Sequence, residues 1–233
     1  MKALYLGDRP IKRAYLGDKL VYEKKADSGI VKVPLPAGYT QIEYIESNSG
    51  QYIDTGLKPT STTKIVMDVE PTVAASSTYK YFFESHYFNA VSGTTRTYVF
   101  RMAWASGVTA SMGYRSSGGA IYTTIDSNKT ARRMTIAMDA NSKTAEVDEV
   151  SKTVGNTTFS ASMNNITFFI YNTDTTTALP AKLYSCQIYS GDTITRDFVP
   201  CKNSTGTPGM FELVNSEFYP SSYSTAFIAG PAV

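Results

Sequence analysis

Two segments of the sequence alternate apolar and polar residues with the two-residue period of a β-strand. In TKIVMDVE, residues 63–70, the apolar residues Ile65, Met67 and Val69 share one face, and the other face carries the charged residues Lys64, Asp68 and Glu70. In RRMTIAMDA, residues 132–140, the three residues Met134, Ile136 and Met138 share one face. Because successive side chains of a strand point to opposite faces, each pattern predicts a half-buried strand whose apolar face must pack against a core.

The rest of the body continues in the same manner. Further strands are predicted in TYKYFFESHYF, TRTYVFRMAW and GAIYTTID, which are separated by clusters of Gly, Ser, Asn and Asp. The segment ITFFIY, from Ile166, is apolar at nearly every position and predicts a central strand covered on both sides. No window of ordinary helix length keeps a 3.6-residue period with caps. The pattern predicts an all-β, two-sheet antiparallel sandwich in which C-terminal strands pair with early ones.

Length and charge limit the partners of the chain. Its 233 residues suit one all-β domain, alone or with an appendage. Charged residues make up 18% and the net charge is +2, without the clustered Lys and Arg run that a phosphate backbone attracts. The start lacks the apolar segment of a signal peptide, and the longest apolar stretch, Phe168–Tyr171, is too short to cross a bilayer. We therefore expect a soluble protein made in the cytoplasm, with neither a nucleic-acid nor a membrane partner.

The first 25 residues contain the letters YLGD twice, ten positions apart. Each copy can form a strand followed by a tight turn at its glycine, but two such units lack the apolar area to cover a core of their own. We predict that this arm docks by adding strands to another chain, through the residues Tyr5, Leu6, Gly7, Asp8, Tyr15, Leu16, Gly17 and Asp18. The alternative, in which the arm folds back on its own sandwich, remains open.

A Pro-rich segment separates this arm from the body. In KKADSGIVKVPLPAGY, residues 24–39, glycines and Asp27 oppose regular structure, while Pro34 and Pro36 keep the chain extended. The predicted organisation is a β-hairpin docking arm at 1–25, a linker at 26–37 and a sandwich domain at 38–233.

Two cysteines flank the predicted hairpin LYSCQIYSGDTITRDFVPC, which turns at Gly191 and Asp192. A two-residue turn pairs Ser190 with Thr193 and places Cys186 opposite Asp197. Cys201 then lies about 13 Å away along the strand, beyond the reach of a disulfide. We predict two buried free thiols.

Strand alternation also predicts which residues of the later segments enter the core. In QYIDTG, Tyr52 and Ile53 are expected to point into the sandwich. In the strand before the hairpin, Tyr184, Cys186 and Ile188 are expected on one face, and Leu183 and Tyr189 on the other. A last hairpin is predicted in MFELVNSEFY about Asn215 and Ser216.

Three segments of the body resemble a known family. LPAGYTQIEYIESNSGQYIDTGL, MTIAMDANSKTAEVDEVSKTVG and AKLYSCQIYSGDTITRDFVPCKNSTGTPGMFELVNSEFY resemble the concanavalin A-like, laminin G-like jelly rolls of bacteriophage and gut-bacterial proteins, over residues 36–230. The arm, LYLGDRPIKRAYLGDKLVYE, is similar to a repeated segment of phage tail and other virion proteins. The resemblance implies a jelly-roll sandwich displayed on a phage particle.

Jelly rolls of this kind include glucanases, so catalysis must be considered. Retaining glycosidases need two carboxylates about 5 to 5.5 Å apart. In TAEVDEVSK, Glu146 and Asp148 share a strand face, but the position where the laminarinase-type pattern requires a further acid is Val150. His86 is the single histidine and has no nucleophile motif near it. The sequence therefore predicts no enzyme and no catalytic residues.

Metal ligands are equally scarce. One histidine and two separated cysteines cannot complete a four-ligand zinc site. The loop residues Asp126, Asn128, Asp139 and Asn141 have the oxygen ligands that Ca²⁺ prefers, but no D-x-[DN]-x-[DN]-G run is present, and turns favour the same residue types. No cofactor is expected and no metal site is indicated, although Ca²⁺ binding remains open.

Sugar binding is easier to build than catalysis, because it needs aromatic faces and polar partners on a rigid scaffold. The region richest in both predicts the ligand-binding residues Trp104, Tyr87, Tyr114, His86, Arg101 and Arg115. We expect a non-enzymatic phage virion component of tail, baseplate or capsid, which contacts other virion proteins, further copies of itself and a host-surface glycan. The alternatives are a bacterial cell-surface glycan-binding protein and a laminarinase-like glycoside hydrolase.

Overall fold

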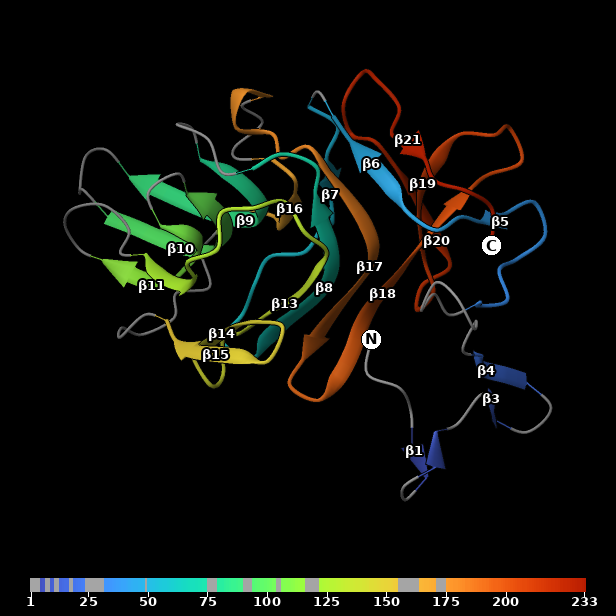
Figure 1. The fold of residues 1–233 in the computed structure, drawn as a ribbon, viewed down its shortest axis with the longest axis horizontal. Helices are drawn as coiled ribbons and strands as arrows, with labels where there is room; N and C mark the ends of the chain where they lie inside the picture. The colour runs from blue at the N-terminus through green and yellow to red at the C-terminus, as the bar shows by residue number, and fades with distance from the viewer. Residues whose placement is uncertain are drawn as a thin grey trace.

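Alternate side chains of the long strands are buried between two antiparallel sheets (Figure 1). The computed structural model describes residues 5–6, 9–10, 13–16, 19–23, 32–48, 50–74, 79–89, 94–103, 106–115, 122–154, 164–170 and 175–233. The described residues before 32, together with 88, 89, 94, 96, 114 and 115, are described by their backbone alone. Over this part of the chain the structure contains strands, one 3₁₀ turn, η1 (Thr175–Thr177), and no α-helix. The predicted all-β sandwich is confirmed.

The smaller sheet has six strands in the order β12-β11-β10-β9-β16-β7. Three long neighbouring strands form its centre, and shorter strands flank them on both sides. The bounds are β7 (Ile53–Asp54), β9 (Lys80–Asn89), β10 (Thr94–Ala103), β11 (Gly107–Arg115), β12 (Thr123–Asp126) and β16 (Thr167–Phe168).

The larger sheet has eleven strands, eight of them in the order β15-β14-β13-β8-β17-β18-β19-β20. Three short strands join its side: β6 pairs with β17 and β21, and β5 pairs with β18. The early strands β5, β6 and β8 therefore pair with late ones, as predicted. The bounds are β5 (Thr40–Gln41), β6 (Ile45–Ser47), β8 (Thr63–Pro71), β13 (Met134–Asp139), β14 (Thr144–Val147), β15 (Val150–Thr153), β17 (Ala181–Ser190), β18 (Thr193–Lys202), β19 (Pro208–Glu212), β20 (Glu217–Pro220) and β21 (Ile228–Ala229).

The core lies between the two sheets and is rich in aromatic rings. The alternation in β8 and β13 is confirmed, because every apolar residue predicted to face inward there is at most 3% exposed. The rings of Phe168 and Phe198, one from each sheet, meet edge to face at 5.7 Å. The largest fully buried side chains are Tyr98, Phe82, Phe83, Phe100, Phe168, Phe169, Phe198, Ile42, Ile45, Ile53, Ile65 and Met67.

Two β-bulges, one in β17 and one in β18, change the faces and the pairs that the alternation predicted. On the ladder with β8, the register shifts between Leu183 and Ser185. Leu183 and Cys186 are therefore both buried, and Tyr184 lies on the outer face instead of beside Cys186. On the ladder with β18, a second shift after Ile188 places Phe198 opposite Cys186, where Asp197 was predicted.

Three other local predictions can be compared with the structure. Ser190 pairs with Thr193, and both cysteines are buried free thiols, as predicted. The predicted central strand in ITFFIY is reduced to Thr167–Phe168, because Phe169 has a φ of 71° and leaves the ladder, although its side chain is fully buried. The last hairpin has a four-residue loop at 213–216.

The segment QYIDTG enters the core with one side chain. Ile53 is fully buried and Tyr52 is half-buried, because neighbouring residues of a strand cannot share a face.

Four short strands precede the sandwich. β1 (Tyr5–Leu6) pairs with β2 (Arg9–Pro10), and β3 (Arg13–Leu16) pairs with β4 (Lys19–Glu23). Each pair is a separate two-stranded sheet. Among the described residues, neither of these sheets pairs with a strand of the sandwich. The predicted docking residues Tyr5, Leu6, Tyr15 and Leu16 lie in these strands, whereas Gly7, Asp8, Gly17 and Asp18 lie outside the described residues.

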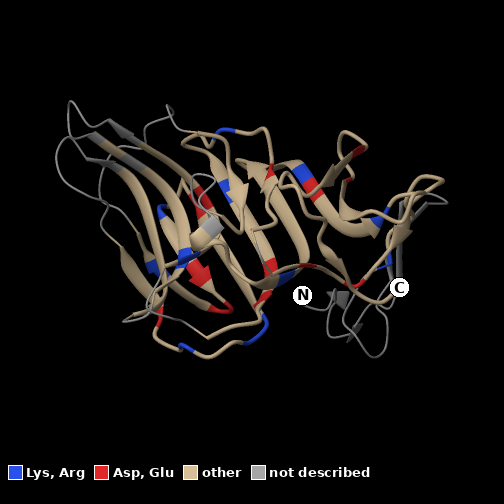
Figure 2. Ribbon diagram, turned by 90° about the horizontal axis from the view of Figure 1, so that it is seen from above, with Lys and Arg blue, Asp and Glu red and all other residues tan. Residues whose placement is uncertain are grey.

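Charges of both signs are distributed along the strands and connections (Figure 2). Positions of Lys and Arg alternate with positions of Asp and Glu, and the described residues form no long stripe of one sign. Among the same residues, no helix has the length and apolar character needed to cross a membrane.

One hydrogen-bonded side chain ties the sheets together inside the core. The hydroxyl of Tyr98, on β10, donates to the carbonyl of Met138 at 2.7 Å and lies 3.1 Å from the carbonyl of Thr63. Burial, with a smaller contribution from Asp139, raises the pKa of Tyr98 well above its ordinary value. The hydroxyl is therefore a permanent donor that bridges the smaller sheet to β13 and β8.

We predict that Tyr98→Phe lowers the free energy of unfolding by about 1–3 kcal/mol, because buried carbonyl oxygens lose their donor. Urea denaturation followed by circular dichroism measures the change. The matched control is Tyr219→Phe, whose hydroxyl bonds Glu217 at an exposed position and should cost much less. Equal losses in the two variants would contradict the bridging role of Tyr98.

Candidate functional site

The outer face of the smaller sheet carries polar side chains that are nevertheless buried. In β10, Tyr98 and Phe100 point into the core, so Thr97, Val99 and Arg101 point to the other side. These three residues are at most 8% exposed. Polar residues of the neighbouring strands are similarly covered, with Glu84, Thr109 and Ser111 each 2% exposed. These covered side chains support the face from beneath, and the more exposed residues at its ends, such as His86 and Tyr79, make it a candidate binding surface.

Hydroxyl groups connect the strands across this face. Thr97 and Ser111 lie opposite each other within hydrogen-bond distance, with 3.0 Å between their Oγ atoms. His86 occupies the position paired with Thr97 on the other neighbouring strand. Burial lowers the pKa of His86, which keeps the imidazole neutral near pH 7. A neutral imidazole and hydroxyl groups suit hydrogen bonding to a neutral polar ligand better than charge pairing.

The strand register divides the six predicted ligand-binding residues into two groups. His86, Tyr87, Tyr114 and Arg115 pair with residues 95–97 of β10, at one end of the sheet. Arg101 is five residues beyond Arg96, about 16 Å further along the strand. Trp104 lies outside the described residues, and the side chains of Tyr114 and Arg115 are not described. The structure therefore does not bring the predicted set together around one point.

Arg101 is held in a stack with two tyrosines that sequence analysis missed. Its guanidinium carbon lies 3.7 Å from the ring centroid of Tyr79 and 3.2 Å from that of Tyr122. Its Nε donates to Thr109 Oγ1 at 3.3 Å. Tyr79 precedes β9 and Tyr122 precedes β12, so the stack joins three separate parts of the sheet. Sequence spacing carries no signal for such a contact, because it depends on the register of three strands.

Tyr81 lies beside this stack and is also affected by it. Burial raises the pKa of Tyr81 above its ordinary value, against the opposing effects of a hydrogen bond from Arg101 and of its charge. Glu84 adds a smaller effect in the same direction as burial. The side chain of Arg101 therefore contacts the neutral hydroxyl group of Tyr81 as well as the rings of Tyr79 and Tyr122.

The outer face of the larger sheet has a different character. Arg133 donates to both carboxylate oxygens of Asp68, at 2.9 and 2.7 Å, and its guanidinium covers the ring of Tyr184 at 3.6 Å. The Tyr184 hydroxyl donates to Glu70, and burial together with this carboxylate raises the pKa of Tyr184. Lys182 also approaches Glu70, at 3.7 Å. These charges are paired with one another, which leaves this face less suited to a charged ligand.

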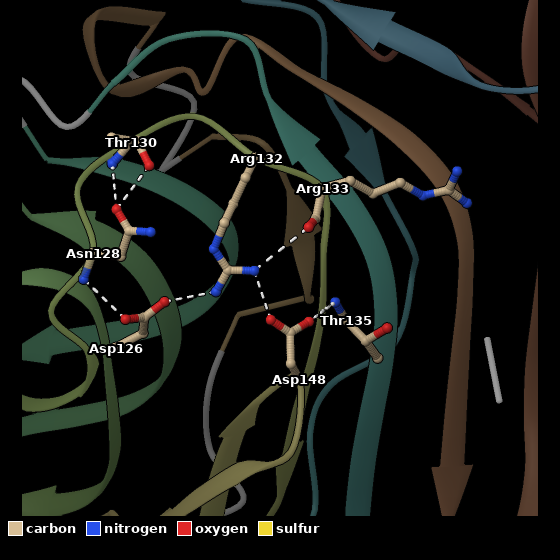
Figure 3. Close-up of polar contacts among 7 residues, drawn as sticks. All are labelled: Asp126, Asn128, Thr130, Arg132, Arg133, Thr135 and Asp148. Carbon is tan, nitrogen blue, oxygen red and sulfur yellow. Dashed lines mark hydrogen bonds and ion pairs between the residues drawn. The ribbon is translucent and has the colours of Figure 1, made fainter.

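Asp126 and Asp148, which were considered for calcium binding and for catalysis, form hydrogen bonds and ion pairs with neighbouring residues (Figure 3). Arg132 donates to Asp126 at 2.7 Å and to Asp148 at 2.6 Å. Asp148 lies in the turn between β14 and β15, with a φ of 53°, and also accepts the N–H of Thr135. Asp148 and Glu146 are therefore not a strand-face pair, which corrects the sequence-based geometry. The carboxylate of Asp148 instead links the turn to β13.

The loop oxygens of calcium type are engaged with their own backbone. Asp126 Oδ1 accepts the N–H of Asn128, and Asp139 Oδ1 accepts the N–H of Asn141, each two residues ahead. These are Asx turns, which explain the residue types without a metal ion. Within the described ranges, no group of three or more His, Cys, Asp or Glu residues is placed to hold a metal ion.

A hollow of about 390 Å³ lies elsewhere, where the linker joins the sandwich. It is bordered by residues 38–42, by the turn at 202–206 and by Ala232. The turn is closed by Asn203, whose Oδ1 accepts N–H groups of Thr205 and Thr207. The side-chain oxygen of Asn203 is therefore occupied by hydrogen bonds within the turn. We regard the outer face of the smaller sheet as the stronger candidate for a binding site.

We predict that the Arg132 bridge makes stability depend on pH. Burial alone would raise the pKa of Asp126, but the Asn128 N–H and Arg132 together lower it. A lowered pKa in the folded state adds stability above the unfolded value of about 3.9, and this stability is lost as the pH falls. Arg132→Gln should reduce the free energy of unfolding at pH 7 by roughly 1 kcal/mol, since the pair is partly exposed.

Urea denaturation at pH 7 and at about pH 2.5 measures this effect, because protonation of Asp126 becomes more favourable as the pH falls. The deficit of Arg132→Gln should shrink there. Lys129→Gln, which removes an exposed neighbouring charge, is the control and should show little change. A deficit that is the same at both pH values would refute the assignment.

Comparisons with known proteins give limited information. No protein-family model and no curated protein matches the chain. A solved structure of the Ruminococcus gnavus IT-sialidase CBM40 is similar, with a TM-score of 0.45 and 13% identity, covering 64% of this chain and 91% of that chain. The same module bound to alpha2,3 sialyllactose has a TM-score of 0.43 and 12% identity, covering 64% and 90%. A likeness of this degree carries no argument about what this chain binds.

Proposed function

We propose that the chain is a non-enzymatic structural component of a bacteriophage particle, which attaches through its N-terminal arm and displays its sandwich to a host-surface glycan. The observation that carries this proposal is the division of strand pairing. Within the residues that the structure describes, the four strands of the arm pair only with one another, in two pairs, whereas the strands from β5 onward form two sheets around a shared core. The sequence resemblance of arm and body to virion proteins supports the same role.

The arm is too small to be stable without a partner. Its hairpins have strands of two to five residues, and an isolated two-stranded hairpin is marginal in water. Each two-stranded sheet also has open edges, which can accept a strand from another chain. We infer that the partner is another virion protein or a further copy of this chain.

The sandwich supports the second half of the proposal. On the outer face of the smaller sheet, the half-buried His86 and the exposed Tyr79 offer imidazole and aromatic groups above a layer of buried, hydrogen-bonded hydroxyls. Carbohydrates present hydroxyl groups beside apolar C–H faces, and they are recognised by this combination of groups. Catalysis is not proposed, because Asp148, one of the two acids considered for it, is engaged by Arg132 and Thr135.

The docking role predicts that removing residues 1–25 abolishes incorporation into particles. The shortened chain should unfold at nearly the same temperature as the complete chain, because the core cluster of described side chains is formed by residues from Ile42 onward. Immunoblotting of purified particles measures incorporation, and calorimetry measures unfolding. A full-length double variant, Leu6→Asp with Leu16→Asp, controls for chain length and should also fail to incorporate. Normal incorporation of the shortened chain would reject the docking role.

The display role predicts selective glycan binding. On an array of bacterial surface glycans, the complete chain should bind a restricted group of structures. A purely scaffolding protein would show no preference among them. Incubation with the bound polysaccharides should release no reducing ends, whereas their release would establish a glycoside hydrolase instead.

A further inference from the structure

The stack of Tyr79, Arg101 and Tyr122, which we call the Arg101 stack, combines a buried cation with an exposed ring. Arg101 is 8% exposed, whereas Tyr79 is 50% exposed and is among the most exposed large apolar residues of the described chain. The guanidinium covers one face of the Tyr79 ring at 3.7 Å, so the exposed half of Tyr79 comprises its other face and its edge. The ring is therefore presented to solvent from a fixed support.

The Arg101 guanidinium, which supports the Tyr79 ring, is itself held by two neighbouring side chains. Tyr122 covers the second face of the guanidinium at 3.2 Å, and Thr109 accepts the Nε–H from the neighbouring strand. A planar guanidinium can stack on two rings at once, which an ammonium group cannot do. A β-bulge of the neighbouring strand β9, where Phe82 has no partner on β10 between Phe83 and Tyr81, lies opposite this point.

Stability alone gives little reason for this arrangement. An exposed tyrosine gains little from burial, and ordering its side chain costs conformational entropy. The Arg101 guanidinium contacts the rings of Tyr79 and Tyr122 and the hydroxyl of Thr109, and rings hold a cation without fixing it to an opposite charge. Ordering an aromatic ring before binding lowers the entropy cost of binding, which is the usual advantage of a preorganised contact residue.

We infer that Tyr79 is a stacking platform for the apolar face of a pyranose ring and that Arg101 is its positioning residue. This inference rests on the proposed glycan-binding function. The C–H groups of a sugar ring carry partial positive charge and pack on the negative face of an aromatic ring. The half-buried Thr124, which pairs in register with Thr109, lies at the same end of the sheet and is a candidate partner for a sugar hydroxyl.

The test compares variants of the complete chain on the glycan array and then measures affinity for the array oligosaccharide with the strongest signal by titration calorimetry. Tyr79→Ala should weaken binding about fivefold to tenfold, as expected for the loss of one aromatic contact. Tyr79→Phe keeps the ring and should bind nearly as well as the natural chain. Tyr223→Ala is the matched control, because Tyr223 is also an exposed tyrosine, at 41%, and should leave affinity unchanged.

The role of Arg101 needs a second measurement. Arg101→Lys keeps the charge but loses the planar stack, so it should weaken binding and increase the mobility of the Tyr79 ring. Fluorine NMR of the chain labelled with 3-fluorotyrosine reports this mobility, and thermal unfolding reports stability. Loss of stability without weaker binding or a more mobile ring would assign Arg101 a purely structural role.

The outcomes separate the two proposals. If the natural chain binds no glycan, the proposed display function fails and the platform fails with it. If the natural chain binds and Tyr79→Ala binds equally well, the display function stands and the platform is rejected. If Arg101→Lys does not fold, the comparison of Tyr79→Ala with Tyr79→Phe still decides the platform, because both substitutions are made at an exposed side chain.

Discussion

The two sheets share a single apolar layer, and this constraint determines what every other part of the sandwich can do. A strand with a two-residue period has only two faces, and burial of one face fixes the other as the outer surface. In β8 the residues Ile65, Met67 and Val69 are fully buried, so their neighbours must face outward. The same rule in β10 directs Tyr98 into the core and Arg101 away from it. Function on this scaffold therefore resides on outer faces and loops.

The outer faces of the two sheets carry different kinds of side chain. On the larger sheet, charges neutralise one another in pairs such as Arg133 with Asp68. On the smaller sheet, hydroxyl groups and rings surround a single buried cation, Arg101. Charge pairing stabilises a surface against solvent without preparing it for a ligand, whereas neutral donors and exposed rings keep their capacity for new contacts. This difference is why we assign binding to the smaller sheet.

Sequence periodicity was sufficient to predict the long strands and the sandwich, because β8 and β13 each have one apolar face. The tight turn between Ser190 and Thr193 and the free state of both cysteines also followed from local spacing. The same periodicity predicts the wrong face where a β-bulge occurs, because one extra residue reverses the faces of the residues that follow it. Thus Tyr184 lies outside, although the alternation predicted it inside with Cys186.

The residues of the candidate site were harder to predict from the sequence than the strands were. Arg101 could be selected for its residue type, but its partners Tyr79 and Tyr122 are 22 and 21 residues away in the chain. Only the register of β9, β10, β11 and β12 brings these residues to one end of the sheet. Periodicity specifies the face of a residue but not its position along a neighbouring strand. That position also explains why the group containing His86 lies about 16 Å from Arg101.

Several carboxylates of the sandwich stabilise its turns. Glu212 is fully buried, yet its two oxygens accept hydrogen bonds from the N–H groups of Asp197, Val214 and Asn215 and from the Asn215 side chain. It thereby closes the loop after β19. Asp148 performs a similar task between β14 and β15. An acid whose oxygens are occupied in this way cannot approach a glycosidic bond without breaking the turn that it stabilises.

The path of the chain supports a separation of attachment from display. The linker enters the body beside β5, where Gln41 accepts the N–H of Val33 through its side chain and the N–H of Val233 through its carbonyl. β5 and β21 both belong to the larger sheet, so the arm leaves the sandwich from that sheet. The Arg101 stack belongs to the smaller sheet. In the proposed arrangement, a pull through the linker would act on strands of the larger sheet and not on those that carry the Arg101 stack.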